Sequence, residues 1–391
     1  MRLCTKALST AALFIATGAF AQPTVVSSSV FATGGPVGGT QPDSITNADG
    51  SIFVEYGNTA VSTGGPDAGN STIVQYSASG AVEHVYTIPG LVDGLKLNPV
   101  TGMIWALQNN DANSTLSLIN PMTHAVTGPL KYAAPPYVYQ VPPTGPGGLG
   151  RGYDDVAFLG GKVYLSYTNP VNPTDPVLQM LNQGNTPSGT LTTTDLLKAN
   201  QTNPLFTSST QNPPDIDSLK STPSGQLVLT SEGDGLGPQW VTSDGRYTLI
   251  SNPGPHETWT NVRVTNAAGV NVNGMDDVIF PGATAGTLYV SSTSGNTIDV
   301  LHLTGLNPAD PIIALGSFNE VGVVNPTTGV VETSLLSIAS PHGMDFIPSS
   351  AGAGVPEPPT WALLLLGFVG LAAAGVRRRR WSGVVSPAAA I

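Results

Sequence analysis

The stretch Asp154-Asp-Val-Ala-Phe-Leu-Gly-Gly-Lys-Val-Tyr-Leu165 is the clearest copy of a unit that recurs along the chain. An Asp is followed two residues later by an aliphatic side chain, and a Gly-x pair then precedes three strand-forming residues. The Asp and aliphatic pair occurs as Asp43/Ile45, Asp93/Leu95, Asp154/Val156, Asp217/Leu219, Asp276/Val278 and Asp345/Ile347. Successive Asp residues are 50, 61, 63, 59 and 69 positions apart. A repeat of this kind indicates stacked supersecondary units.

Each unit contains three or four short strands. The first five Asp pairs are followed by Gly50-Ser-Ile-Phe-Val, Gly102-Met-Ile-Trp-Ala, Gly161-Lys-Val-Tyr-Leu, Gly225-Gln-Leu-Val-Leu and Gly286-Thr-Leu-Tyr-Val. Apolar residues alternate with period 2 between Gly, Asn, Asp and Pro turns, which is typical of β-structure. One unit cannot bury both of its faces alone, whereas radial stacking of four-stranded blades covers them. We therefore expect an all-β fold, a β-propeller over residues 22–350, with six blades as the expected number.

The number of blades is the least determined part of this prediction. Residues 319–336 have the pattern of an additional hairpin, which leaves five or seven blades open. The last unit ends at Pro348, so a strand from Thr24 to Ala32 is expected to complete a blade and close the ring. A β-sandwich or a β-helix with loosely similar strands is the alternative architecture.

The start of the sixth unit carries a resemblance to known propellers. Pro341-His342-Gly343-Met344-Asp345 is close to the first-strand consensus of NHL-type and gluconolactonase-like propellers. The resemblance implies the propeller architecture. For the gluconolactonase type it also implies one divalent ion, held at the channel by a few carboxylates and an Asn. The ligands of that family do not match this chain residue by residue, so the resemblance supports the fold more than the activity.

The repeated Asp residues are the main candidate site. If their strands are the innermost strands of the blades, the first residues of these strands surround one mouth of the central channel. Carboxylates at close range either take up protons or bind a cation such as Ca²⁺ or another divalent ion. The alternative is that each Asp caps a turn by accepting backbone N–H groups between blades. The candidate ligands are Asp43, Asp93, Asp154, Asp217, Asp276 and Asp345, with Asp155, Asp215 and Asp277 nearby.

No catalytic constellation is recognisable in the sequence. Gly145-Pro-Gly-Gly-Leu-Gly150 matches a dinucleotide-binding pattern in form only, because it lies in a Pro-rich loop without a following helix. The five His residues lack metal-ligand spacing, although His342 is expected at the channel beside Asp345. We expect a binding or structural module, and a metal-dependent lactonase-like hydrolase on the same scaffold is the alternative.

Residues 1–21 have the pattern of a secretory signal peptide. Arg2 and Lys6 precede an apolar stretch, and Ala19-Phe-Ala21 is a small-x-small cleavage site, with cleavage expected after Ala21. The one cysteine, Cys4, lies within this segment. The mature chain therefore has no thiol for disulfides, thiolate metal sites or nucleophilic catalysis.

The body between the terminal segments is sparsely charged and acidic. Of 14 basic and 25 acidic residues, six basic and one acidic residue lie in those segments, which leaves 8 basic and 24 acidic residues and a formal charge of −16. Nucleic-acid binding needs a basic surface, so the composition argues against a nucleic-acid partner. It is compatible with divalent cations.

The C-terminal part has three segments in a fixed order. Val355, Pro356, Glu357 and Pro358 lie in a Pro-rich linker (351–359), the uncharged run 360–376 follows, and the tail 377–391 starts with four arginines, Arg377, Arg378, Arg379 and Arg380. The uncharged run is near the lower length limit for a transmembrane helix, and the arginines predict that the tail stays cytoplasmic. A helix packed on the body is the alternative.

Residues 355–380 together resemble the PEP-CTERM sorting signal. The resemblance implies export through the secretion machinery of a Gram-negative bacterium and a membrane-anchored intermediate. An exosortase would then act at Pro356-Glu357-Pro358, and the protein would reach the cell surface or the extracellular matrix. Polysaccharide or protein partners are expected there. The chain departs from the usual signal in continuing beyond the arginines through residues 381–391.

Overall fold

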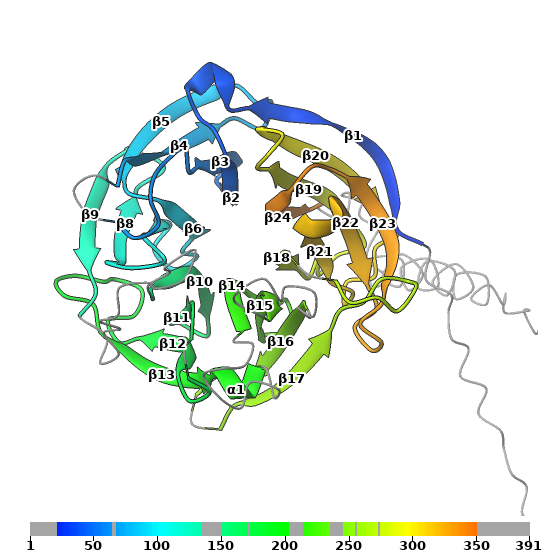
Figure 1. Ribbon diagram of the computed structural model, residues 1–391. Helices are drawn as coiled ribbons and strands as arrows, with labels where there is room; N and C mark the ends of the chain where they lie inside the picture. Colours follow the sequence, from blue (N-terminus) through cyan, green and yellow to red (C-terminus); the bar gives the residue numbers. More distant parts are fainter. Residues whose placement is uncertain are drawn as a thin grey trace, which may run out of the picture. The chain divides into compact units, whose positions relative to one another are not determined.

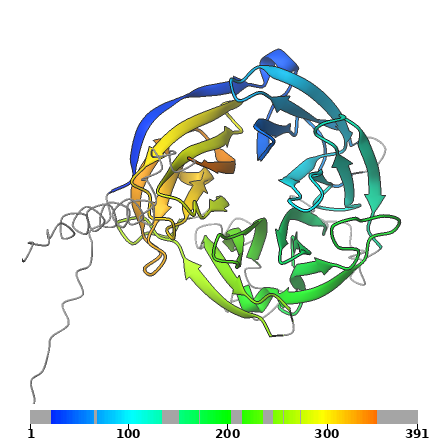
Figure 2. The same cartoon turned by 180° about the vertical axis from the view of Figure 1, so that it is seen from behind.

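The computed structural model describes residues 22–64, 68–133, 151–170, 172–202, 214–234, 245–254, 256–272 and 274–349. In these residues the strands form six four-stranded antiparallel sheets arranged around a central axis (Figures 1 and 2). The expected six-bladed β-propeller is therefore confirmed. The predicted signal peptide, linker, transmembrane helix and Arg cluster lie outside the described residues. Within the described ranges, no helix has the length and apolar character required to cross a bilayer.

Blades 1 to 4 follow the chain, with the first strand of each innermost. Blade 1 comprises β2 (Pro42–Ala48), β3 (Ser51–Tyr56), β4 (Asn70–Tyr76) and β5 (Val82–Pro89). Blade 2 comprises β6 (Val92–Leu97), β7 (Ile104–Gln108), β8 (Thr115–Ile119) and β9 (Val126–Lys131). Blade 3 comprises β10 (Tyr153–Leu159), β11 (Lys162–Tyr167), β12 (Pro176–Leu181) and β13 (Thr193–Lys198), followed by α1 (Ala199–Thr202). Blade 4 comprises β14 (Pro214–Ser221), β15 (Leu227–Asp234), β16 (Arg246–Ser251) and β17 (Thr258–Arg263).

Blades 5 and 6 exchange strands along the chain. Blade 5 comprises β18 (Met275–Ile279), β21 (Ile312–Leu315), β22 (Glu320–Val324) and β23 (Val331–Ser337). Blade 6 comprises β24 (Pro341–Pro348), β19 (Ala285–Ser292), β20 (Thr297–Thr304) and β1 (Thr24–Thr33). The chain thus leaves blade 5 after one strand, builds the middle of blade 6, and then returns to complete blade 5.

This exchange corrects the expected composition of the fifth unit. The strand that starts near Gly286 does not pair with the strand of Asp276; it pairs with β24, in the register Gly286↔Pro348. In this pairing Leu288 and Val290 of β19 lie in one buried cluster with Met344 and Phe346 of β24, whereas β18 pairs with β21. Residues 319–336, expected as an additional hairpin, form β22 and most of β23 and complete blade 5 without adding a blade.

The N-terminal strand closes the ring, as the sequence predicted. β1 pairs antiparallel with β20, from Thr24↔Thr304 to Thr33↔Thr297. Blade 6 is therefore built from both ends of the propeller sequence, and Figure 1 shows β1 on the outside of this blade.

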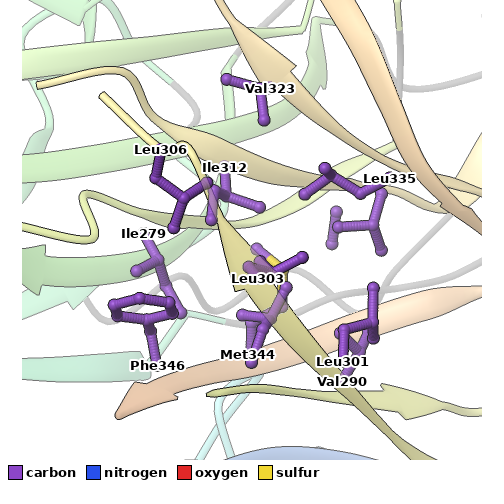
Figure 3. Close-up of a cluster of buried hydrophobic side chains, with 13 residues drawn as sticks. Ile279, Val290, Leu301, Leu303, Leu306, Ile312, Val323, Leu335, Met344 and Phe346 are labelled. Carbon is purple, nitrogen blue, oxygen red and sulfur yellow. The ribbon is translucent and has the colours of Figure 1, made fainter. Parts of the chain in front are cut away.

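The hydrophobic core is divided among the blade junctions. Each of six buried apolar clusters joins two neighbouring blades, and Figure 3 shows the cluster between blades 5 and 6, where Ile279, Leu303 and Met344 lie together. Trp105, a fully buried residue of β7, packs edge-on against Phe158 of blade 3. Each sheet thus covers its apolar face with the next sheet, which fixes the innermost strands around the channel.

Candidate functional site

A β-bulge recurs at the same place in all six innermost strands. In blade 3, for example, Tyr153 pairs with Tyr167 and Val156 pairs with Leu165, so two residues of β10 oppose one residue of β11. Bulges of this kind redirect side chains and interrupt pairing. The two bulge residues are Asp43-Ser44, Asp93-Gly94, Asp154-Asp155, Asp217-Ser218, Asp276-Asp277 and His342-Gly343.

The first bulge residues form a ring at the channel, which we call the acidic ring. Its members are Asp43, Asp93, Asp154, Asp217, Asp276 and His342. The five Asp residues all line one cavity of about 20 Å³. A cavity of that size has room for a water molecule or a single ion. The structure thus brings five of the six predicted Asp residues together.

The sixth predicted residue, Asp345, occupies a different place. It lies three positions beyond His342 on β24, and its Oδ2 accepts a hydrogen bond from Asn47 Nδ2 at 2.6 Å. His342 takes the ring position in blade 6, since His342-Gly343-Met344 aligns with Asp93-Gly94-Leu95 at the bulge. The sequence already indicates this alignment, because a Gly and then an apolar residue follow His342, as they follow Asp93. The side chain of Asp215, which was also expected nearby, lies outside the described part of the chain.

One half of the acidic ring is organised around His342. Its Nδ1 lies 2.8 Å from Asp276 Oδ1 and 3.8 Å from Asp43 Oδ1, and its Nε2 lies 3.1 Å from the Ser340 hydroxyl. One potential ligand atom of each of Asp43, Asp276 and His342 lies within 4.8 Å of the others. A protonated imidazole would place a positive charge between these two carboxylates.

The other half contains Asp93, Asp154 and Asp217, whose potential ligand atoms also lie within 4.8 Å of one another. Asn110 Nδ2 donates to Asp154 Oδ1 at 3.1 Å and to Asp93 Oδ2 at 3.4 Å. The carbonyl Oδ1 of Asn110 is buried and has no hydrogen-bond partner among the described residues. This half therefore gathers three carboxylates, two of which accept hydrogen bonds from the Asn110 amide.

Asp93 is the ring member whose protonation is most clearly affected. Burial is the main cause that raises the pKa of its carboxyl to about 7, and the nearby charges of Asp43, Asp111 and Asp155 contribute to this value. A hydrogen bond with Asp154 acts in the opposite direction. Near neutral pH, this carboxyl can therefore hold either a proton or a cation, because both relieve the repulsion among the carboxylates.

The second bulge residues hold neighbouring blades together. Asp155 Oδ2 accepts from the backbone N–H of Leu219 in blade 4 at 3.0 Å, and Asp277 Oδ2 accepts from that of Met344 in blade 6 at 2.6 Å. For these two residues, the backbone-bonding role considered as the alternative applies across blades. Where the neighbouring blade comes closest, the second bulge residue is Gly94 or Gly343.

Two lysines lie on the other side of these carboxylates. Lys96 Nζ is 3.1 Å from Asp155 Oδ2, while Lys220 Nζ donates to Asp277 Oδ2 and, at 2.7 Å, to the carbonyl oxygen of Met344. Neither lysine was predicted from the sequence. The pattern that could have identified them is a Lys three residues after the Asp of the second and fourth units.

Glu55 is a second residue that the sequence analysis missed. It lies on β3 opposite the bulge of blade 1, at the position taken by Ser166 and Thr230 in blades 3 and 4, whose hydroxyls bond the bulge backbone. Glu55 is fully buried, and neither carboxyl oxygen has a hydrogen bond of normal geometry among the described residues. Burial raises its pKa well above the ordinary value; the charge of Asp43 adds to this, while the nearby Ser71 hydroxyl partly offsets it.

Comparison with known proteins identifies the C-terminal segment. Residues 354–380 match the PEP-CTERM protein-sorting motif, which confirms the predicted resemblance. The motif indicates an exported protein of a Gram-negative bacterium that is processed by an exosortase. The comparison with curated proteins finds no matching relative.

Solved structures with similar folds include lactonase and glycosidase propellers. A periplasmic gluconolactonase of Pseudomonas aeruginosa is 12% identical, with a TM-score of 0.39 over 78% of this chain and 88% of that one. A putative 6-phosphogluconolactonase of Bacteroides uniformis is 10% identical, with a TM-score of 0.43 over 78% and 87%. An alpha-L-arabinofuranosidase of Fusarium graminearum is 10% identical, with a TM-score of 0.47 over 77% and 83%.

Proposed function

We propose that the protein is an exported binding module of the cell surface or extracellular matrix, and that its acidic ring holds a divalent cation, Ca²⁺ in the first place. The observation that carries this proposal is the placement of five Asp side chains on equivalent bulges around one small cavity. Carboxylates gathered in this way need a compensating charge. Oxygen ligands in this number suit a hard cation such as Ca²⁺.

The half formed by Asp93, Asp154 and Asp217 is the preferred position for the cation. The opposite half already contains the imidazole of His342 beside Asp276, whereas this half offers three carboxylates, two of which accept hydrogen bonds from Asn110 Nδ2. Three carboxylates at this range repel one another unless a positive charge lies among them. A cation bound among these oxygens would supply that charge.

The partner would bind at the mouth through the cation. The ligands from Asp93, Asp154 and Asp217 leave coordination positions that hydroxyl or carboxylate oxygens can fill, because Ca²⁺ takes six to eight oxygen ligands. Polysaccharides offer such oxygens, and so do acidic protein segments. The sorting motif, with Pro356-Glu357-Pro358 presented to an exosortase and residues 360–376 as a temporary membrane anchor, would deliver the module to this environment.

Metal-dependent hydrolysis of the lactonase type is the second candidate. The observation that favours it is the pair of His342 and Asp276 on the same ring as the proposed cation site. A bound cation polarises a carbonyl and positions water, and a neighbouring imidazole accepts a proton. In that case, lactone turnover would be lost in Asp154→Asn and in His342→Gln.

Calcium binding to the purified propeller tests the proposal directly. We expect isothermal titration of the metal-free protein with Ca²⁺ to show one site, with affinity reduced at least tenfold in Asp154→Asn, because a charged oxygen ligand is replaced by a neutral one. Asp195→Asn, on the exposed face of β13, is the matched control. Absence of Ca²⁺ binding, or equal binding by the Asp154 variant, would refute the cation site.

The sorting step is tested by the intact mass of protein recovered from its natural location. Processing by an exosortase predicts that this mass lacks the Arg cluster.

A further inference from the structure

A second, larger cavity opens at the end of the channel opposite the acidic ring. Its volume is about 430 Å³, which is within the range of small-molecule sites. Its lining comes from the second halves of the innermost strands and the residues after them, so all six blades contribute. Lys96 lines this cavity and the small cavity of the acidic ring, and therefore lies between them.

The walls of the large cavity are mainly apolar. Phe158, Phe280 and Phe346 come from blades 3, 5 and 6, and Ile45 and Leu97 come from blades 1 and 2. At the rim, Pro99, Pro223 and Pro281 follow three of the six strands, and Pro348 ends a fourth. Rim residues with fixed backbone angles form a preformed opening, and apolar walls favour a ligand with an apolar body.

The inner end of the cavity is polar and carries two ammonium groups. Lys96 Nζ has one ion-pair partner, Asp155, so two of its three N–H donors have no protein acceptor among the described residues. Lys220 Nζ uses two donors, on Asp277 and on the carbonyl oxygen of Met344. The lysine side chains are 17% and 14% exposed, so their remaining donors face a restricted space. Such donors form strong hydrogen bonds with a carboxylate.

We infer that this cavity is a binding site for an amphipathic monocarboxylate, whose carboxylate would contact Lys96 and Lys220 and whose apolar body would lie against the phenylalanines. The two ends of the channel would then prefer ligands of opposite charge, because the acidic ring repels anions and the lysine end attracts them. A cationic ligand is disfavoured by the two ammonium groups. This site is distinct from the proposed cation site, since it uses a separate cavity and none of the ring carboxylates, although Ile45 and Lys96 line both cavities.

Asp345 is expected to weaken the binding of an anion in this cavity. Its carboxyl lines the same cavity, near Lys96 and Lys220, and accepts a hydrogen bond from Asn47. An ionised Asp345 opposes a second carboxylate in the cavity, so its removal should strengthen binding. A loss of affinity on removing Lys96 and a gain on removing Asp345 cannot both result from partial unfolding.

Dodecanoate is a suitable probe, with dodecanol and dodecyltrimethylammonium as head-group controls. Isothermal titration in EDTA, which keeps metal away from the acidic ring, should show one dodecanoate site. We expect about tenfold or greater weakening in Lys96→Met and several-fold strengthening in Asp345→Asn. Lys162→Met, at an exposed position of β11, should bind as the wild type does. Ser221→Trp, at an exposed position of the rim, should block binding while leaving the core intact.

Three results would overturn the inference. The first is no dodecanoate binding by the wild type. The second is dodecanol binding as tightly as dodecanoate, which would remove the carboxylate from the assignment. The third is unchanged binding in both Lys96→Met and Ser221→Trp. Thermal melts of each variant separate loss of fold from loss of the site.

Discussion

His342 Nδ1 lies 2.8 Å from Asp276 Oδ1, and this contact joins the innermost strands of blades 6 and 5. The same nitrogen lies 3.8 Å from Asp43 of blade 1, so the imidazole stands between the two neighbouring blades. It occupies the position that Asp occupies in the other five blades. In this half of the acidic ring a protonated histidine can supply positive charge to both carboxylates, as the proposed cation would in the other half.

Replacing His342 with Asp should therefore change stability and cation affinity in opposite directions. In EDTA we expect the free energy of unfolding to fall by about 1–3 kcal/mol, because hydrogen bonds to charged groups contribute about this much and three carboxylates then lie together. Ca²⁺ affinity should rise, because one more oxygen ligand is present. Denaturation with and without Ca²⁺ measures both effects. His302→Asp, at an exposed position of β20, is the control, and equal stability of the two variants in EDTA would contradict the compensating role of His342.

The pKa of Asp93 predicts how cation binding depends on pH. This pKa is raised to about 7, so a proton occupies the carboxyl below that pH and must leave before a cation binds. Ca²⁺ affinity should fall about tenfold for each pH unit below 7 and level off above it. Titrations at pH 6, 7 and 8 measure the slope. Asp93→Asn should bind more weakly and show a smaller slope; if the slope is unchanged, another group competes with the cation.

The propeller was predictable because its blades repeat. Asp93-Gly-Leu and Gly102-Met-Ile-Trp-Ala show the alternation and the turn of one blade without reference to any other part of the chain. The exchange between blades 5 and 6 was not predictable in this way. Gly286-Thr-Leu-Tyr-Val has the same local pattern whichever partner it takes, and its pairing with β24 depends on contacts with residues far away in the sequence.

The acidic ring was predictable in part, for a related reason. Five members share the Asp and aliphatic spacing, but the spacing selected Asp345 in the sixth unit because charge was used to align it. Alignment by the bulge places His342 there instead. Glu55 escaped prediction because it acts on the paired strand, opposite the bulge of its own blade, and Lys96 because it acts on the next blade. Single-strand patterns contain no information about such neighbours.

Burial of Glu55 predicts a decrease of stability with rising pH. Its folded-state pKa is raised well above 4.5, so the folded protein holds this proton more tightly than the unfolded chain does. The resulting stability is complete below about pH 4.5 and is lost as the pH rises toward the folded-state pKa, by at most about 1.4 kcal/mol per pH unit.

Glu55→Gln should therefore gain stability relative to the wild type as the pH increases from 5 to 8. Urea denaturation at several pH values gives the difference in the free energy of unfolding between the two proteins. Glu332→Gln, at an exposed position of β23, should show no such trend. A constant difference between Glu55→Gln and the wild type over this range would mean that the carboxyl does not change protonation on unfolding.

Gly94 and Gly343 should be intolerant of even one methyl group. A Cβ at Gly94 would lie 2.4 Å from the carbonyl oxygen of Asp154, and a Cβ at Gly343 would lie 2.4 Å from that of Asp43. Both contacts are with the backbone of a neighbouring bulge, which a rotamer change cannot relieve. We expect Gly94→Ala and Gly343→Ala each to lower the free energy of unfolding by about 1–3 kcal/mol. They should also weaken Ca²⁺ binding, because the displaced bulges carry ring carboxylates. Gly35→Ala is the control, since a Cβ there would meet no atom within 4 Å. If the two bulge variants are as stable as Gly35→Ala, the close approach of neighbouring bulges does not fix the acidic ring.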